Sequence, residues 1–206
     1  MKKTTILLAI ACLLNFTVKA QDDEKCVHKG TSIIDVYYGF PNLYGAAFKT
    51  LVAQSGETNV TSSGIGPMGG KYEFLLADFF GLGVDFNYST YTVKYQDATQ
   101  DQNGNPTVYH YSFTTPAIRA MLAANFHFVR GKRIDFYGAV KTGYYSRSIT
   151  FTSDDPNYNF TWKTLLPIAF RMETGIRYFF IPNVGIHANV GIGGGPLAAV
   201  GVSLKF

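Results

Sequence analysis

Apolar and polar residues alternate with a period of two in eight runs of this chain, and charge is confined to one face of each run. In one run, Ile134, Phe136 and Val140 share a face, and Asp135 and Lys141 share the other. Because successive side chains of a strand point to opposite sides, each run predicts a strand with one charge-free face. The interior of a soluble β-sandwich is apolar and would not contain so many charged residues. The pattern therefore predicts a barrel with an apolar exterior and a polar interior.

An eight-stranded barrel has an interior only wide enough to be filled by side chains. Buried charges require partners, so the inward charged residues should form a network of ion pairs that plugs the lumen. His127 and His187 also point inward and are expected to join this network instead of acting as general bases. Its predicted charged members are Asp35, Lys71, Glu73, Asp85, Arg119, Asp135, Lys141, Arg147, Lys163, Arg171, Glu173 and Arg177.

The outward faces fit a lipid environment. Outside the first 20 residues, no segment approaches the roughly 18 uninterrupted apolar residues of a membrane helix. A membrane protein without such helices must be a closed barrel. In the sixth run, Trp162, Leu166 and Ile168 are expected outside, with Lys163 inside. The predicted fold is all-β, an eight-stranded antiparallel up-and-down transmembrane β-barrel over residues 31–206.

The N-terminus resembles an export signal. Lys2 and Lys3 precede an apolar run from Ile6 to Leu14, and Ala20 ends a site that suits signal peptidase. Residues 1–20 are therefore predicted to be a cleaved signal peptide, and residues 21–30 a mobile periplasmic tether. A lipoprotein box at Cys12 is the alternative.

Loop lengths alternate along the chain. Short connections near 78–79, 130–132 and 181–183 predict periplasmic turns, and longer ones at 41–64, 96–107 and 153–159 predict surface loops. Both termini then lie in the periplasm. In the first long loop, Leu43, Ala47 and Leu51 approximate helical spacing, which predicts a short helix as a contact surface or as a lid.

The last strand has Val202 and Leu204 on one face and ends in Phe206. With Gly201, these residues resemble the terminal signal by which outer-membrane barrels are recognised by their assembly machinery. Together with strand number and topology, this resembles small eight-stranded barrels of the outer membrane protein X and outer membrane protein A membrane-domain type. The corner at Gly39 to Asn42 and the start at Gln21 resemble Bacteroidetes barrels.

Several functions are disfavoured by the sequence. Without the signal, 15 basic residues stand against 14 acidic ones, which implies no nucleic-acid partner. Cys26 is the only mature cysteine, so no internal disulfide is expected, and with His28 it makes no metal site. The glycines at 191 and 193–195 predict a hairpin and not a phosphate cradle. No cofactor is expected.

We therefore expect a non-enzymatic outer-membrane barrel that is structural or binds an unknown ligand through its surface loops. Its expected partners are outer-membrane lipids, lipopolysaccharide and the assembly machinery. The alternative is a lipid-modifying enzyme, because His110 and Ser112 share an outward face as in lipid A deacylases. The neighbouring outward positions offer it no carboxylate. A small pore is a third possibility.

Overall fold

The computed structural model describes residues 25–40, 43–54, 58–100, 106–155 and 158–206, so the predicted signal peptide lies outside it. These residues form ten antiparallel strands and one helix. In chain order they are β1 (Ser32–Phe40), α2 (Leu43–Gln54), β2 (Thr58–Ala77), β3 (Phe80–Gln100), β4 (Pro106–Thr114), β5 (Ala117–Arg130), β6 (Ile134–Ser153), β7 (Phe160–Lys163), β8 (Ile168–Ile181), β9 (Val184–Gly193) and β10 (Ala198–Lys205).

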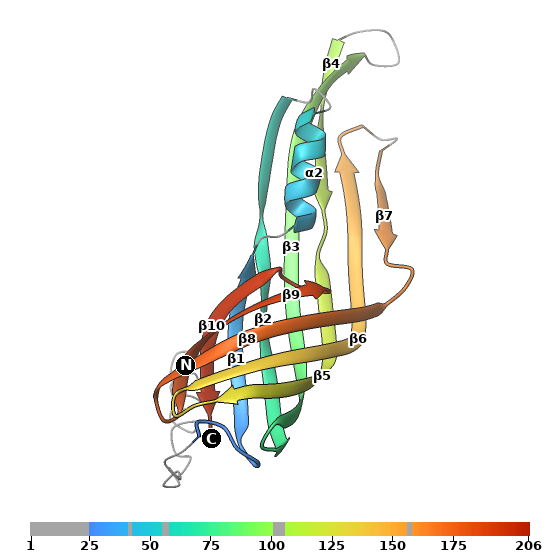
Figure 1. Cartoon of the computed structure of the whole chain (residues 1–206). Coiled ribbons are helices and arrows are strands. Elements are labelled where there is room, and N and C mark those ends of the chain that lie inside the picture. The colour runs from blue at the N-terminus through green and yellow to red at the C-terminus, as the bar shows by residue number, and fades with distance from the viewer. Residues whose placement is uncertain (1–24, 41–42, 55–57, 101–105, 156–157) are drawn as a thin grey trace, which may run out of the picture.

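Eight of the strands close into a ring, in the order β1, β2, β3, β5, β6, β8, β9 and β10. The ring closes because the first strand pairs with the last, with Tyr37 opposite Gly201. Closure leaves no free sheet edge within the ring. The predicted all-β antiparallel barrel is therefore present (Figure 1).

The other two strands continue ring strands after a break. Thr115 and Pro116 separate β4 from β5, and the link 164–167, which ends in Pro167, separates β7 from β8. Proline cannot donate a ladder hydrogen bond, so an interruption at these positions is expected. The strand number of eight predicted from the sequence thus counts each interrupted pair as one strand.

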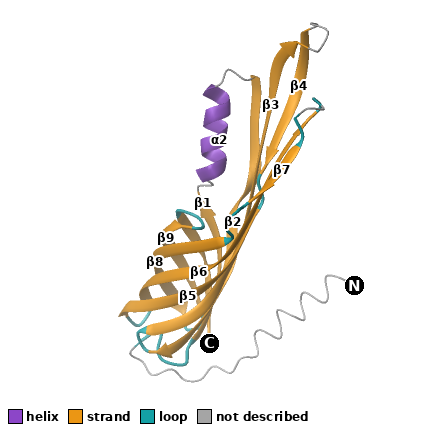
Figure 2. Cartoon of the chain, turned by 90° about the vertical axis from the view of Figure 1, so that its right-hand side faces the viewer, coloured by secondary structure: helices purple, strands orange, loops and turns teal. Residues whose placement is uncertain are grey.

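The two ends of the ring differ in construction. The short connections at residues 78–79, 131–133 and 182–183 lie together at one end, called here the turn end. At the other end, the outer halves of β2, β3 and β6 continue beyond the ring with β4 and β7 as a protruding sheet, called here the wall (Figure 2). Helix α2 stands above the ring and contacts β2 and β3.

The wall was not foreseen. The sequence predicts loops at 41–64 and 96–107, yet residues 58–64 lie in β2 and residues 96–100 lie in β3. The reason is that residues 58–65 are mostly Thr, Ser, Asn and Gly, without the apolar alternation that marked the other strands. Backbone pairing continues here without an apolar face. The helix predicted within 41–64 is present as α2.

Burial in the ring is inverted relative to a soluble protein. In β8, exposed and buried residues alternate from Ile168 to Phe180; all the charged residues are buried, and the apolar residues other than Ala169 and Phe179 are exposed. None of the even-numbered, outward positions of the ring strands carries Asp, Glu, Lys or Arg. These are the even-numbered residues within 34–40, 68–76, 80–88, 118–128, 134–144, 168–180, 184–192 and 198–204. Within the described part of the chain, no helix is long and apolar enough to cross a membrane.

Residues 25–30 lie across the turn end of the lumen and are called here the strap. The Cys26 amide donates to the Gly131 carbonyl over 2.8 Å, and the Lys205 ammonium donates to the Cys26 carbonyl. Val27 is fully buried, in an apolar cluster with Cys26, Ile33, Leu75 and Phe179. The expectation of a mobile tether is therefore wrong for this part of it. Burial raises the pKa of the Cys26 thiol to about 11.

Candidate functional site: the lumen and the wall

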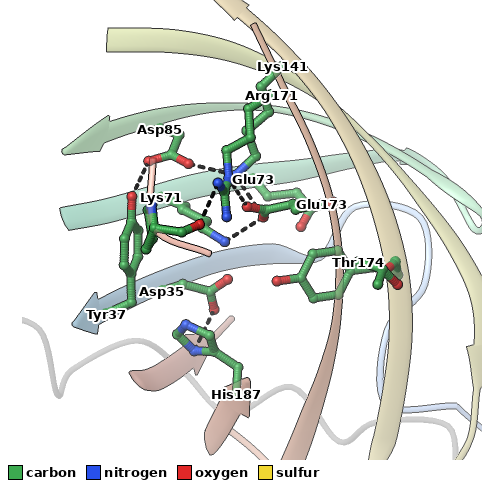
Figure 3. A network of polar contacts seen from close by, with 12 residues as sticks. Asp35, Tyr37, Lys71, Glu73, Asp85, Lys141, Arg171, Glu173, Thr174 and His187 are labelled. Atoms are coloured by element: carbon green, nitrogen blue, oxygen red, sulfur yellow. Dashed lines mark hydrogen bonds and ion pairs between the residues drawn. The ribbon is translucent and has the colours of Figure 1, made fainter. Parts of the chain in front are cut away.

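The lumen brings together ten of the twelve predicted network residues, each at most 9% exposed. They project inward from β1, β2, β3, β5, β6 and β8, because the odd-numbered positions of these strands face the lumen. Figure 3 shows the centre of this network. The ten are Asp35, Lys71, Glu73, Asp85, Arg119, Asp135, Lys141, Arg171, Glu173 and Arg177.

Arg177 is the centre of the half of the network nearer the turn end. Its guanidinium lies 2.9 Å from Asp35, 2.9 Å from Glu73 and 2.8 Å from Asp135. The His127 ring bridges two of these carboxylates, at 2.8 Å from Glu73 and 2.7 Å from Asp135. Five groups from five strands are thus joined directly.

Glu173 is the second centre, nearer the wall end. Its carboxylate lies 2.6 Å from Lys71, 2.7 Å from Lys141 and 2.8 Å from Arg171 (Figure 3). Lys141 also lies 2.5 Å from Asp85. Because each of these charges has an oppositely charged neighbour, the arrangement offsets the cost of removing charge from water.

Neutral hydrogen-bonding members of this network were missed from the sequence. The Tyr37 hydroxyl donates to Asp85 over 2.7 Å, and the Ser203 hydroxyl donates to Asp35 over 2.6 Å. Ser203 also lies 3.0 Å from the His187 ring, which extends the network to β9 and β10. Both missed residues, Tyr37 and Ser203, occupy inward positions of the period-two pattern. A search of these positions for any polar side chain, and not only for charged ones, would have identified them.

Lys163 lies outside the lumen, contrary to prediction. It is exposed on β7 opposite Ser148, whereas Trp162 pairs with Ile149 on the side that continues the lumen face. The pairing of β8 with β6 differs from that of β7 by one residue, and a one-residue slip reverses the two faces of a strand. The break at 164–167 therefore places Trp162, predicted outside, on the opposite face. Arg147 is half-buried at the wall end.

Aromatic rings cross the wall on the face that continues the lumen side. Tyr95 stacks on Tyr111 at 5.2 Å, Tyr111 lies 5.8 Å from Phe151, and Phe151 stacks on Phe160 at 5.3 Å between ring centroids. The row thus joins β3, β4, β6 and β7. Tyr111 is buried, but Phe160 is 54% exposed and Trp162 next to it 68% exposed. This cluster of rings is covered at one side of the wall and open at the other.

The opposite face of the wall carries the predicted His110 and Ser112. The expectation that no carboxylate lies nearby is wrong, because Asp154 accepts from the His110 amide over 2.8 Å and contacts its ring over 2.9 Å. These donors lower the pKa of Asp154. Asp154 follows β6 and meets His110 through the pairing of β6 with β4. Ser112 forms no hydrogen bond with this ring in the described structure.

The described residues contain no group of three or more His, Cys, Asp or Glu side chains that could hold a metal ion. Cys26 is buried and His28 is exposed, with its ring 2.9 Å from the Lys29 carbonyl. The glycines at 193–195 form the turn between β9 and β10, with Gly193 and Gly195 at positive φ angles of 96° and 143°. Glycine suits both positions for that backbone reason.

No known protein family matches the sequence, and no characterised protein does. Among solved structures, the N-terminal β-barrel domain of Pseudomonas aeruginosa OprF is similar at 16% identity and TM-score 0.44, covering 87% of this chain and 99% of that one. The attachment invasion locus protein Ail of Yersinia pestis gives 14% and 0.43, covering 86% and 99%. The outer membrane protein OprG of P. aeruginosa gives 11% and 0.45, covering 87% and 97%.

Proposed function

We propose that this chain is an integral outer-membrane barrel of a Gram-negative envelope, with the strap and both termini in the periplasm and the wall outside the cell. The observation that carries the proposal is the inverted burial of the ring, with charge inside and an uncharged apolar surface outside. A Lys or Arg at the midplane of the lipid-facing surface would cost about 2 to 4 kcal/mol. If this surface faced water, charged residues would not be excluded from it.

Fractionation and surface labelling test the location and the orientation. The protein should be recovered with the outer membrane and should migrate faster on gels before heating than after. A cysteine in place of Leu165, which is 89% exposed beside the wall, should react with an impermeant maleimide in intact cells. Cys26 should not. Labelling of neither site in cells, with labelling of Leu165→Cys in lysed cells, would reverse the orientation.

We propose that the role is non-enzymatic and that the wall is a binding surface. The open part of the aromatic row, Phe160 and Trp162 with Tyr158, exposes large rings, and contiguous exposed apolar groups mark contact sites. A photo-reactive residue at Trp162 should give a discrete adduct in intact cells. The matched control is Val108, which is 51% exposed on the opposite face of the wall. Equal adducts from both positions, or none from either, would contradict the proposal.

The filled lumen supports a barrel that does not conduct. Nine of the ten buried charged residues of the predicted network form ion pairs with one another, and the apolar cluster under the strap covers the turn end of the lumen. Purified protein in planar bilayers should show no stepwise conductance. Reproducible single-channel steps would favour the pore instead.

A second candidate is an enzyme, which the His110–Asp154 contact favours because a carboxylate on one ring nitrogen orients the other. Its position does not suit a lipid substrate. His110 pairs with Gln96, eight residues along β3 from the outward Tyr88, or roughly 26 Å of strand. His110→Ala should leave the lipid A mass spectrum of expressing cells unchanged. A changed spectrum would establish the enzyme.

A further inference from the structure

Three arginines from three strands converge at the wall end of the lumen, and one of them, Arg171, also belongs to the Glu173 centre of ion pairing. They are Arg119 of β5, Arg147 of β6 and Arg171 of β8. The Arg119 guanidinium lies 4.7 Å and that of Arg147 lies 5.7 Å from the centre of one ring, that of Tyr145. Two positive groups are therefore held on a single aromatic side chain.

The turn between β9 and β10 brings the third arginine to the same place. A Cβ atom at Gly194 would lie 3.4 Å from Arg119 Nε, and one at Gly195 would lie 3.0 Å from Arg171 Nη1. This glycine turn thus rests on Arg119 and Arg171 through consecutive residues. Arg119 and Arg171 are buried, whereas Arg147 is half-buried, so part of the Arg147 side chain is open to solvent.

Buried donors without acceptors accumulate here. Arg171 is 2% exposed, and its Nη1 donates to the Pro196 carbonyl over 2.7 Å, but its Nη2 has no acceptor among the described residues. Asn87 accepts from Arg119 over 3.1 Å through Oδ1, which leaves its amide nitrogen without an acceptor. A buried donor is costly unless an acceptor is supplied.

We propose that these groups form a binding site for a tetrahedral oxyanion, a phosphate or a sulfate, at the wall end of the lumen. Guanidinium groups present parallel N–H donors that match the oxygens of such anions. An oxyanion would supply acceptors to Arg171 Nη2 and place negative charge beside Arg119 and Arg147. Its source is a free ion or a phosphorylated sugar from the cell surface. The site does not depend on the proposed function of the wall.

Calorimetric titration of the purified full-length protein in detergent tests the site, with sodium phosphate against sodium chloride at equal ionic strength. Saturable binding of phosphate is expected, at about one ion per chain. Arg147→Gln should weaken it about tenfold or more, because a charge-assisted hydrogen bond is lost. Lys163→Gln removes the same charge from an exposed position outside the lumen and should leave the affinity unchanged.

Arg119→Gln should weaken binding further, and faster migration before heating reports whether it folds. If it does not fold, the half-buried Arg147 variant still decides. Glucose 1-phosphate against glucose forms the second arm, in which tighter binding than inorganic phosphate identifies a sugar phosphate as the source. If phosphate binds no more than chloride does, the buried donors are occupied by water alone, and the proposal is overturned. An equal loss in the Lys163 variant would overturn it too, as general charge attraction.

Discussion

The turn end of this barrel buries a cluster of apolar side chains, whereas several large apolar side chains at the wall end are exposed. At the turn end, Val27, Leu75 and Phe179 pack together under the strap. At the wall end, Leu165 and Trp162 are largely exposed on or beside a sheet that has left the ring. One end of the barrel therefore has a closed apolar core, and the other end has exposed apolar side chains. The difference indicates that stability lies in the ring and the strap, and that the wall is free to make contacts.

The largest expected effect is in the ring. Arg177→Met leaves Asp35, Glu73 and Asp135 without their shared cation and should lower the free energy of unfolding by about 3 to 5 kcal/mol. Urea unfolding in detergent micelles, followed by tryptophan fluorescence, measures it. Arg133→Met is the control, because Arg133 is exposed at the turn end. Equal losses in both variants would mean that the network contributes no more than a surface charge does.

A pair of leucines compares the two ends directly. Leu75→Ala removes a fully buried side chain from the cluster and should cost about 3 kcal/mol in unfolding free energy. Leu165→Ala removes the same atoms from a side chain that is 89% exposed and should cost under about 0.5 kcal/mol. The same unfolding assay serves for both. A comparable loss at Leu165 would show that the wall end is packed in solution and would remove the contrast.

The strap is tested through its own thiol. Because burial raises the pKa of Cys26 from 9.0 to about 11, its thiolate fraction near neutral pH is lower by about a hundredfold, and alkylation should accelerate with pH up to about 11. Val27→Asp would place a charge in the apolar cluster and release the strap. The alkylation rate at neutral pH should then rise about a hundredfold, with the profile levelling near pH 9. Leu51→Asp in α2, at an exposed position, should leave the rate unchanged. A slow thiol in the Val27 variant would show that the strap does not depend on this cluster.

The ring could be predicted because lipid and lumen impose opposite chemistry on alternate residues, and Asp35, Lys141 and Arg177 follow that rule. The wall and the contacts between its strands could not be predicted from this alternation. Residues 58–65 continue β2 by backbone hydrogen bonds, which leave no trace in side-chain pattern. Asp154 reaches His110 only because the two residues meet across β4 and β6, far apart in sequence. The search for charged inward residues identified the ionic members of the network, but Tyr37 and Ser203 belong to it through their hydroxyl groups.

The smallest expected effect concerns the break between β7 and β8. Lys163→Met should change the free energy of unfolding by under about 0.5 kcal/mol, because the side chain is exposed and its strand is shifted by one residue relative to β8. Lys141→Met, at a buried position that contacts both Asp85 and Glu173, should cost several kcal/mol, because it leaves two buried carboxylates without this cation. Unfolding of the two variants side by side measures the difference. A large loss at Lys163 would place that lysine in the lumen and restore an uninterrupted strand. A small one means that a proline and a one-residue slip suffice to turn lumen positions of the ring into outer positions of the wall.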